Sequence, residues 1–180
     1  ERTEFIPAWE FVYAPGMDMT SIHPHVCRSL SNAGCNNVSD FLDRMIVVDY
    51  LVGNEDRHYG NFGLLRNADT LEVVGFAPMF DTGSSLGYNI QNEWIRKRYV
   101  PQSMTFSRSH EEQLRLVGSF DWMDLDRLTG MEDYVQEVFE GYGRYIDRDR
   151  VEAVSGFLLD RVEKLKVIAG NHRESRDACS

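Results

Sequence analysis

Long apolar runs, paired cysteines and an excess of basic charge are all missing from this sequence, and each absence excludes a class of protein. No stretch approaches the roughly 18 to 20 consecutive apolar residues of a membrane span, and the N-terminus carries no signal-peptide pattern. The three cysteines, Cys27, Cys35 and Cys179, lack the C-x-x-C spacing of a zinc site. A net charge of −10 disfavours broad attraction to nucleic acid or anionic lipid. These absences predict a soluble, cytoplasmic protein that contacts neither nucleic acid nor a membrane directly.

The length of 180 residues and a hydrophobic content of 42% suit one compact domain or one lobe of a larger protein. The chain begins at Glu1, without Met, so we expect an excised fragment. Residues 1–38 are predicted to form a hinge-like segment, because Pro7 confines any strand there to a sheet edge or a connector. A short helix is expected around residues 25–33.

A buried helix is predicted from Ser39, its expected N-cap, to the Gly53-Asn54 stop, because apolar residues occur nearly all round it. Two short strands at residues 62–66 and 71–76, joined by a tight turn, predict a β-hairpin. The polar run at residues 54–61 lies between helix and hairpin, so we expect this loop to be held at both ends.

Residues 84–108 show no periodicity and form a long predicted loop, of the kind that is usually functional or disordered. Its basic cluster Arg96-Lys97-Arg98 either contacts phosphates or an acidic substrate, or is simply solvated. Residues 109–170 are predicted to be helical, with capping boxes at Ser109/Glu112 and Thr129/Glu132. The polar tail, residues 171–180, is expected to fray.

Two short motifs supply the residue types that phosphoryl transfer requires. Asp56 precedes Asn61 by five residues, the D-x-x-x-x-N interval of a kinase catalytic loop. Asp81 lies 20 residues beyond Asn61, after the hairpin, where the metal-binding Asp of a D-F-G motif would be. Buried helix, loop, hairpin and Asp-x-Gly follow one another in the order of a kinase C-lobe.

Two sequence stretches, Asp-Arg-His-Tyr-Gly-Asn-Phe-Gly-Leu-Leu and Ala-Pro-Met-Phe-Asp-Thr-Gly-Ser-Ser-Leu, resemble the HipA-type kinases. These are bacterial serine/threonine kinases, often the toxins of toxin–antitoxin modules. Their D-R-H-x-x-N core is similar to that of phosphoinositide and related lipid kinases. The resemblance extends over roughly residues 4–165, and its specific part lies between residues 41 and 86.

The resemblance implies Asp56 as a catalytic residue, Asn61 and Asp81 as Mg²⁺ ligands, and His58 as a loop residue near the γ-phosphate of ATP. Whether Asp56 or His58 takes the proton stays open. The implied fold is mainly α with a small β-hairpin, a kinase-like C-lobe at residues 39–170 with an activation-segment-like loop at 84–108. No Gly-rich phosphate loop or strand lysine precedes it, so we expect these residues alone to bind ATP poorly.

The resemblance further implies a protein hydroxyl as phosphate acceptor, with a lipid or small-molecule hydroxyl as a further option, and an antitoxin-like partner protein. A non-catalytic, partner-binding kinase-like module is the first alternative. A second is a homodimeric aspartic protease that uses Asp81-Thr82-Gly83, although such enzymes need two aspartates that share a proton. The His23-x-His25-x-Cys27 pattern lacks an evident fourth metal ligand, and Pro24 predicts a loop there.

Overall fold

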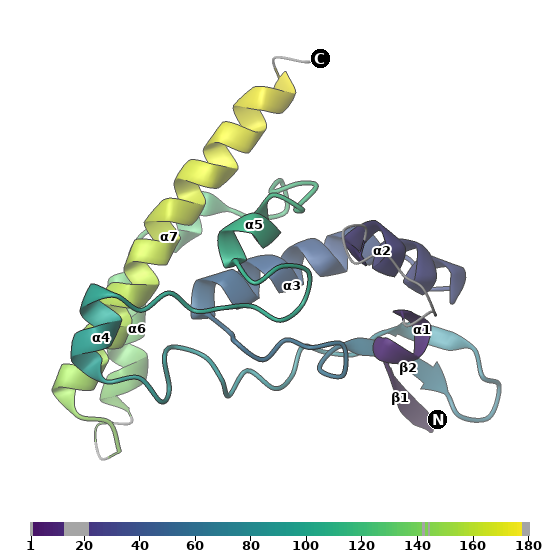
Figure 1. Ribbon diagram of the computed structural model, residues 1–180, viewed down its shortest axis with the longest axis horizontal. Coiled ribbons are helices and arrows are strands. Elements are labelled where there is room, and N and C mark those ends of the chain that lie inside the picture. Colours follow the sequence, from purple (N-terminus) through teal and green to yellow (C-terminus); the bar gives the residue numbers. More distant parts are fainter. Residues whose placement is uncertain (1, 13–21, 142, 144, 178–180) are drawn as a thin grey trace.

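The computed structural model describes residues 2–12, 22–141, 143 and 145–177, which form a mixed α/β structure that is about half helical (Figure 1). A small three-stranded antiparallel sheet lies at one end, and a long C-terminal helix lies at the other. The elements in chain order are β1 Thr3–Pro7, α1 Trp9–Val12, α2 Ile22–Asn32, α3 Val38–Val52, β2 Gly63–Asn67, β3 Val73–Phe76, α4 Asn92–Lys97, α5 His110–Leu114, the 3-10 helix η2 Leu125–Leu128, α6 Met131–Glu140 and α7 Arg148–Asp177.

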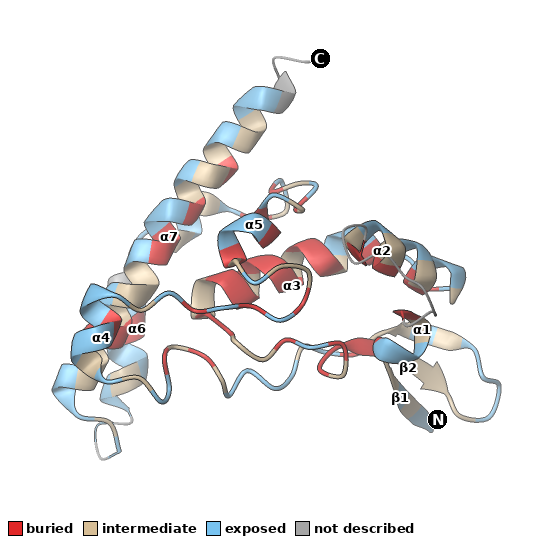
Figure 2. Cartoon of the chain, in the orientation of Figure 1, coloured by how far each residue is buried: buried red, intermediate tan, exposed pale blue. Residues whose placement is uncertain are grey.

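Helix α3 is the central element of the fold. Buried residues occupy most of its length, as Figure 2 shows, and they belong to two hydrophobic clusters, so that one helix supports both. The predicted stop is confirmed: Gly53 takes the left-handed conformation at φ 62°, and its N–H bonds the last carbonyls of the helix. The predicted N-cap is wrong, because the helix begins at Val38 after Asn37, whose own φ is 57°. Asn tolerates this conformation, so the chain enters the helix without a side-chain cap bond.

The predicted hairpin is confirmed as β2 and β3, and a third strand extends it. β1 pairs antiparallel with β2 from Thr3↔Asn67 to Pro7↔Gly63, which corrects both the prediction of a hairpin alone and that of a hinge-like segment at residues 3–7. Pro7 is tolerated because β1 is an edge strand. Gly63 is required at this crossing, since a Cβ there would lie 2.1 Å from the carbonyl oxygen of Ile6.

Three further segments differ from the sequence prediction. Residues 84–108 contain the helix α4, which packs against α7. The predicted helical segment 109–170 is broken by irregular chain at residues 115–124 and by η2. Helix α7 continues through residue 177, so residues 171–177 are helical rather than frayed, while residues 178–180 lie outside the described part of the chain.

The two predicted capping boxes have different outcomes. Ser109 caps α5, because its side chain accepts a hydrogen bond from the Glu112 N–H. The Glu112 side chain does not bond the Ser109 N–H directly, as a capping box would require. Instead, the Ser107 hydroxyl accepts from the Ser109 N–H and donates to the Glu112 carboxylate. Thr129 caps no α-helix: α6 begins after Gly130, which has φ 82°. A left-handed glycine turns the chain here in place of a side-chain cap.

The His23, His25 and Cys27 pattern lies on helix α2 rather than in a loop. Pro24 falls in the first turn of that helix, where no intrahelical N–H bond is lost. His25 Nε2 lies 2.9 Å from the Val12 carbonyl oxygen, and the His23 ring packs edge-on against Phe106. Within residues 2–12, 22–141, 143 and 145–177, no group of three or more His, Cys, Asp or Glu side chains is placed to hold a metal.

In the part of the chain that the structure describes, no helix combines the length and the apolar character needed to cross a bilayer.

Candidate functional site

The predicted catalytic loop follows α3 directly and ends where β2 begins. Asn61 is buried, Asp56 is half-buried and His58 is exposed at the surface. Asp81 is also exposed, in the irregular chain beyond β3, and its backbone takes the left-handed conformation at φ 56°. This conformation is uncommon outside glycine, and such backbone outliers cluster at functional sites.

Arg57 lies in the loop between Asp56 and His58, the two residues predicted to be catalytic. It forms a buried ion pair. Its side chain is 0% exposed and forms a two-pronged ion pair with Asp49 of α3, with Nε 2.9 Å from Oδ2 and Nη2 3.1 Å from Oδ1. The paired Asp49 side chain is 6% exposed. Helix α3 therefore anchors the loop through a charge pair shielded from water.

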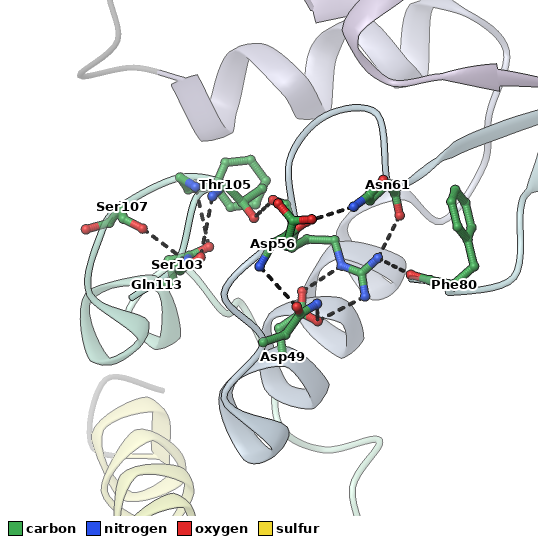
Figure 3. Close-up of polar contacts among 11 residues, drawn as sticks. Asp49, Asp56, Asn61, Phe80, Ser103, Thr105, Ser107 and Gln113 are labelled. Atoms are coloured by element: carbon green, nitrogen blue, oxygen red, sulfur yellow. Dashed lines mark hydrogen bonds and ion pairs between the residues drawn. The ribbon is translucent and has the colours of Figure 1, made fainter. Parts of the chain in front are cut away.

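The remaining guanidinium nitrogen brings the two predicted metal-ligand positions together. Arg57 Nη1 donates to the carbonyl oxygen of Asn61 and to that of Phe80, each at 2.6 Å. The two oxygens therefore lie no more than twice this distance apart. Figure 3 shows Asn61 and Phe80, whose carbonyl oxygens share this donor. Because Phe80 immediately precedes Asp81, one buried side chain holds the backbones next to Asn61 and Asp81 near each other.

Hydrogen bonds within the loop continue this network. Asn54 donates from Nδ2 to Asp49 Oδ1 at 2.9 Å, and its own Oδ1 accepts from the Asp56 N–H at 3.1 Å. Asn61 donates from Nδ2 to the Asp56 carbonyl oxygen at 2.8 Å. Figure 3 shows Asp49, Asp56 and Asn61 close to one another, and the Arg57 guanidinium contacts both Asp49 and Asn61. The Asn61 amide is thus oriented by its nitrogen, and its oxygen is the atom suited to a hard cation.

Residues that follow Asp81 in the chain brace the loop from outside. The Thr105 hydroxyl donates to the Arg57 carbonyl oxygen, and Tyr59 donates its hydroxyl to the Thr105 carbonyl at 2.8 Å. The Glu55 N–H donates to the Ser84 carbonyl at 3.0 Å. The Glu55 carboxylate accepts from the Tyr99 hydroxyl at 2.9 Å. The segment at residues 84–108 is therefore tied to the predicted catalytic loop at both of its ends.

The site contains the donors that Mg²⁺ prefers, but few of them. Asn61 supplies an amide oxygen and Asp81 a carboxylate, and both are hard oxygen ligands. Mg²⁺ usually completes its coordination with waters and substrate phosphates, so a pair of protein oxygens fits a nucleotide-bound ion.

Sequence reasoning missed Arg57 and Asp49. Both signals were present: Arg57 stands inside the D-R-H motif, and Asp49 is a carboxylate in a helix that is apolar on nearly every side. A charge on a buried helix requires a partner, because an unpaired buried carboxylate is costly. An arginine eight residues further on was the cation within reach.

Comparisons with known proteins indicate the family and the fold of this chain. The family model described as HipA-like C-terminal domain matches residues 8–150. The curated serine/threonine-protein kinase CtkA of Helicobacter pylori (strain J99) is 52% identical to this chain over 42 residues. That segment is 23% of this chain and only 13% of the relative.

The crystal structure of a Helicobacter pylori proinflammatory kinase CtkA has a similar fold, with a TM-score of 0.67. The match covers 98% of this chain and 74% of that one, at 18% sequence identity. At this identity the likeness shows the fold alone.

Proposed function

Because the chain belongs to the family of HipA-like C-terminal domains, we propose that it is the catalytic C-lobe of an ATP-dependent serine/threonine protein kinase. The single observation that supports this most is the Arg57 contact with the Asn61 and Phe80 carbonyl oxygens, because it brings the D-x-x-x-x-N loop and the Asp-Thr-Gly segment together. A phosphotransferase needs these two segments side by side.

Each loop residue has a proposed role. Asp56 addresses the acceptor hydroxyl, and its half-buried position leaves the carboxylate within reach of a substrate. His58 is exposed beside it, close to where the γ-phosphate would lie, and its Nδ1 accepts from the Gly60 N–H at 3.0 Å. That bond orients the ring and leaves Nε2 as the nitrogen that can exchange a proton with a substrate. Either side chain can therefore serve as the base.

Asn61 and Asp81 are the proposed Mg²⁺ ligands. When bound, the ion would neutralise negative charge on the nucleotide phosphates. Arg57 contributes by fixing both backbones before substrate arrives, so little reorganisation is needed in the transition state. ATP affinity of these 180 residues alone is proposed to be low, because the sequence shows no Gly-rich phosphate loop or partner lysine upstream of the site. From the family resemblance we also propose a protein substrate, an antitoxin-like partner protein and a cytoplasmic location.

The test is γ-phosphate transfer from MgATP by the full-length gene product, read as a mass gain of one phosphate on itself or on a generic protein. Asp56→Asn and Asp81→Asn should each abolish transfer, whereas Asp40→Asn, on the exposed face of α3, should leave it unchanged. Far-ultraviolet circular dichroism of each variant confirms that it is folded. Transfer that survives both site substitutions would refute the proposed roles.

A partner-binding module without catalysis is the alternative from a different class. It predicts no transfer and no MgATP binding by the full-length protein, and partner capture that tolerates Asp56→Asn and Asp81→Asn. The aspartic protease reading is not favoured, because a half-helical chain of this family is unlike the almost all-β structure that such enzymes require.

A further inference from the structure

Helices α4 and α7 pack together at one side of the molecule (Figure 1). Residues of both helices line a groove there. It encloses a cavity of about 610 Å³. Five basic side chains line it: Arg96, Lys97, Arg98, Arg161 and Lys164. A basic lining is unexpected in a chain with a net charge of −10. None of the predicted catalytic residues contributes to this cavity.

Arg161, on α7, is the most deeply buried of these side chains, with 5% of the residue exposed. Its Nε donates to the Tyr50 carbonyl oxygen, and its guanidinium carbon lies 4.0 Å from the centre of the Tyr50 ring. Its Nη2 is buried without a hydrogen-bond partner. Among the described residues no carboxylate lies within ion-pair distance of Arg161.

A buried guanidinium without an anion is an expensive arrangement. Burial lowers the pKa of the Arg161 guanidinium, but arginine remains charged in proteins. Two neighbouring side chains also have an unsatisfied buried polar atom, the Tyr50 hydroxyl and His110 Nε2. The Tyr50 and His110 rings pack edge-to-face, with their centroids 6.5 Å apart. Of these three residues only Arg161 lines the groove, so its guanidinium is the group that brings positive charge and an unsatisfied N–H to the cavity wall.

The cavity also contains carboxylates, and most of them are already paired. Asp160 lies 2.6 Å from Lys164, and Glu152 lies 3.2 Å from Arg148. Glu111 accepts a hydrogen bond from its neighbour Ser109. Glu111 and Asp160 also act electrostatically on the Arg161 guanidinium and raise its pKa, but neither forms an ion pair with it.

In the basic cluster Arg96-Lys97-Arg98, on the exposed side of the groove, two of the three cations form ion pairs. Arg96 pairs with Asp149 at 2.5 Å, and Lys97 pairs with Glu93 at 2.6 Å. Arg98 lies over the Trp94 ring at 5.7 Å from its centre, with no ion pair recorded among the described residues. Arg161 inside and Arg98 at the mouth are therefore the two lining arginines without an acidic partner.

We propose that this groove binds a phosphate monoester, with Arg161 and Arg98 as its principal contacts. A phosphate dianion matches the planar fork of arginine, which presents paired N–H donors to two oxygens. It also supplies an acceptor to the Arg161 guanidinium, whose Nη2 has no hydrogen-bond partner among the described residues. The ligand is either free phosphate or a phosphorylated side chain of a protein. This site is separate from the Asp56 loop and does not rest on the proposed kinase activity.

The test is isothermal titration of the chain with inorganic phosphate and, separately, with a phosphoserine peptide beside its unphosphorylated form. Arg161→Gln and Arg98→Gln should each weaken phosphate binding, by about tenfold or more for Arg161. The matched control is Arg127→Gln, a highly exposed arginine that pairs with Asp124 outside the groove. Tighter binding of the peptide than of phosphate identifies a phosphorylated side chain as the source, and equal or weaker binding identifies free phosphate.

Arg98→Gln keeps the test decisive if Arg161→Gln does not fold, because Arg98 is exposed and its loss leaves no buried group unpaired. Phosphate should also raise the thermal midpoint of the unsubstituted chain and of Arg127→Gln, but less in Arg98→Gln. Absence of binding by the unsubstituted chain, or equal affinities in Arg98→Gln and Arg127→Gln, would overturn the proposal.

Discussion

Replacement of Asp49 by Asn should destabilise the protein far more than its small chemical change suggests. The substitution keeps the shape of the side chain but leaves the Arg57 guanidinium, which is 0% exposed, without its anion. Removal of one partner from a buried ion pair costs about 3–5 kcal/mol. For a chain of this length that corresponds to a fall of roughly 10 °C in the thermal midpoint.

Urea unfolding followed by circular dichroism measures this loss directly. The control is Asp40→Asn on the same helix, whose pair with Arg44 is exposed and should contribute about 0–1 kcal/mol. A loss for Asp49→Asn no larger than that of Asp40→Asn would refute the idea that the buried pair holds the loop.

A double variant separates stability from positioning. Asp49→Leu with Arg57→Met removes both charges together, and such replacements often recover much of the stability that a single substitution loses. The Asn61 and Phe80 carbonyl oxygens would still lose their common donor. We therefore expect a urea midpoint above that of Asp49→Asn, with phosphotransfer by the full-length protein still impaired. Full activity in a folded double variant would contradict the positioning role of Arg57.

Two further predictions concern burial and close approach. Burial lowers the pKa of His110 to about 4 from an ordinary 6.5, so the folded state binds fewer protons than the unfolded state between these values. The unfolding free energy should fall by up to about 3 kcal/mol as pH drops through this window. Urea titrations at several pH values should show a smaller fall for His110→Gln, and an equal dependence of the unfolding free energy on pH in both proteins would count against this. Gly63→Ala should destabilise by roughly 1–3 kcal/mol, because its Cβ would meet the Ile6 carbonyl. Gly170→Ala, in open space on α7, should instead stabilise by about 0.5–1 kcal/mol in the same urea assay, and equal effects would argue against the clash.

Much of the framework around the site could be predicted because its signals are local. The apolar pattern of α3, the glycine that ends it and the turn between β2 and β3 each depend on a few adjacent residues. The spacing of Asp56, Asn61 and Asp81 is equally readable, and it located the candidate loop. The outer boundaries were less readable, since Pro24 and Pro7 suggested irregular chain where a first helical turn and an edge strand accept proline.

The sequence by itself determined the order and the spacing of the residues that we propose for phosphoryl transfer. Only the tertiary structure decided what holds them: the Arg57 ion pair with α3, its bond to Phe80 from 23 residues away, and the brace from Thr105 at a separation of 48. The partners of a buried charge are set by which chain segments fold against it, and contacts over such separations leave no periodic pattern in the sequence. The half-buried Asp56 and the exposed Asp81 are thus readable as a motif, whereas the buried partners of the arginine that aligns their segments are found only in the folded chain.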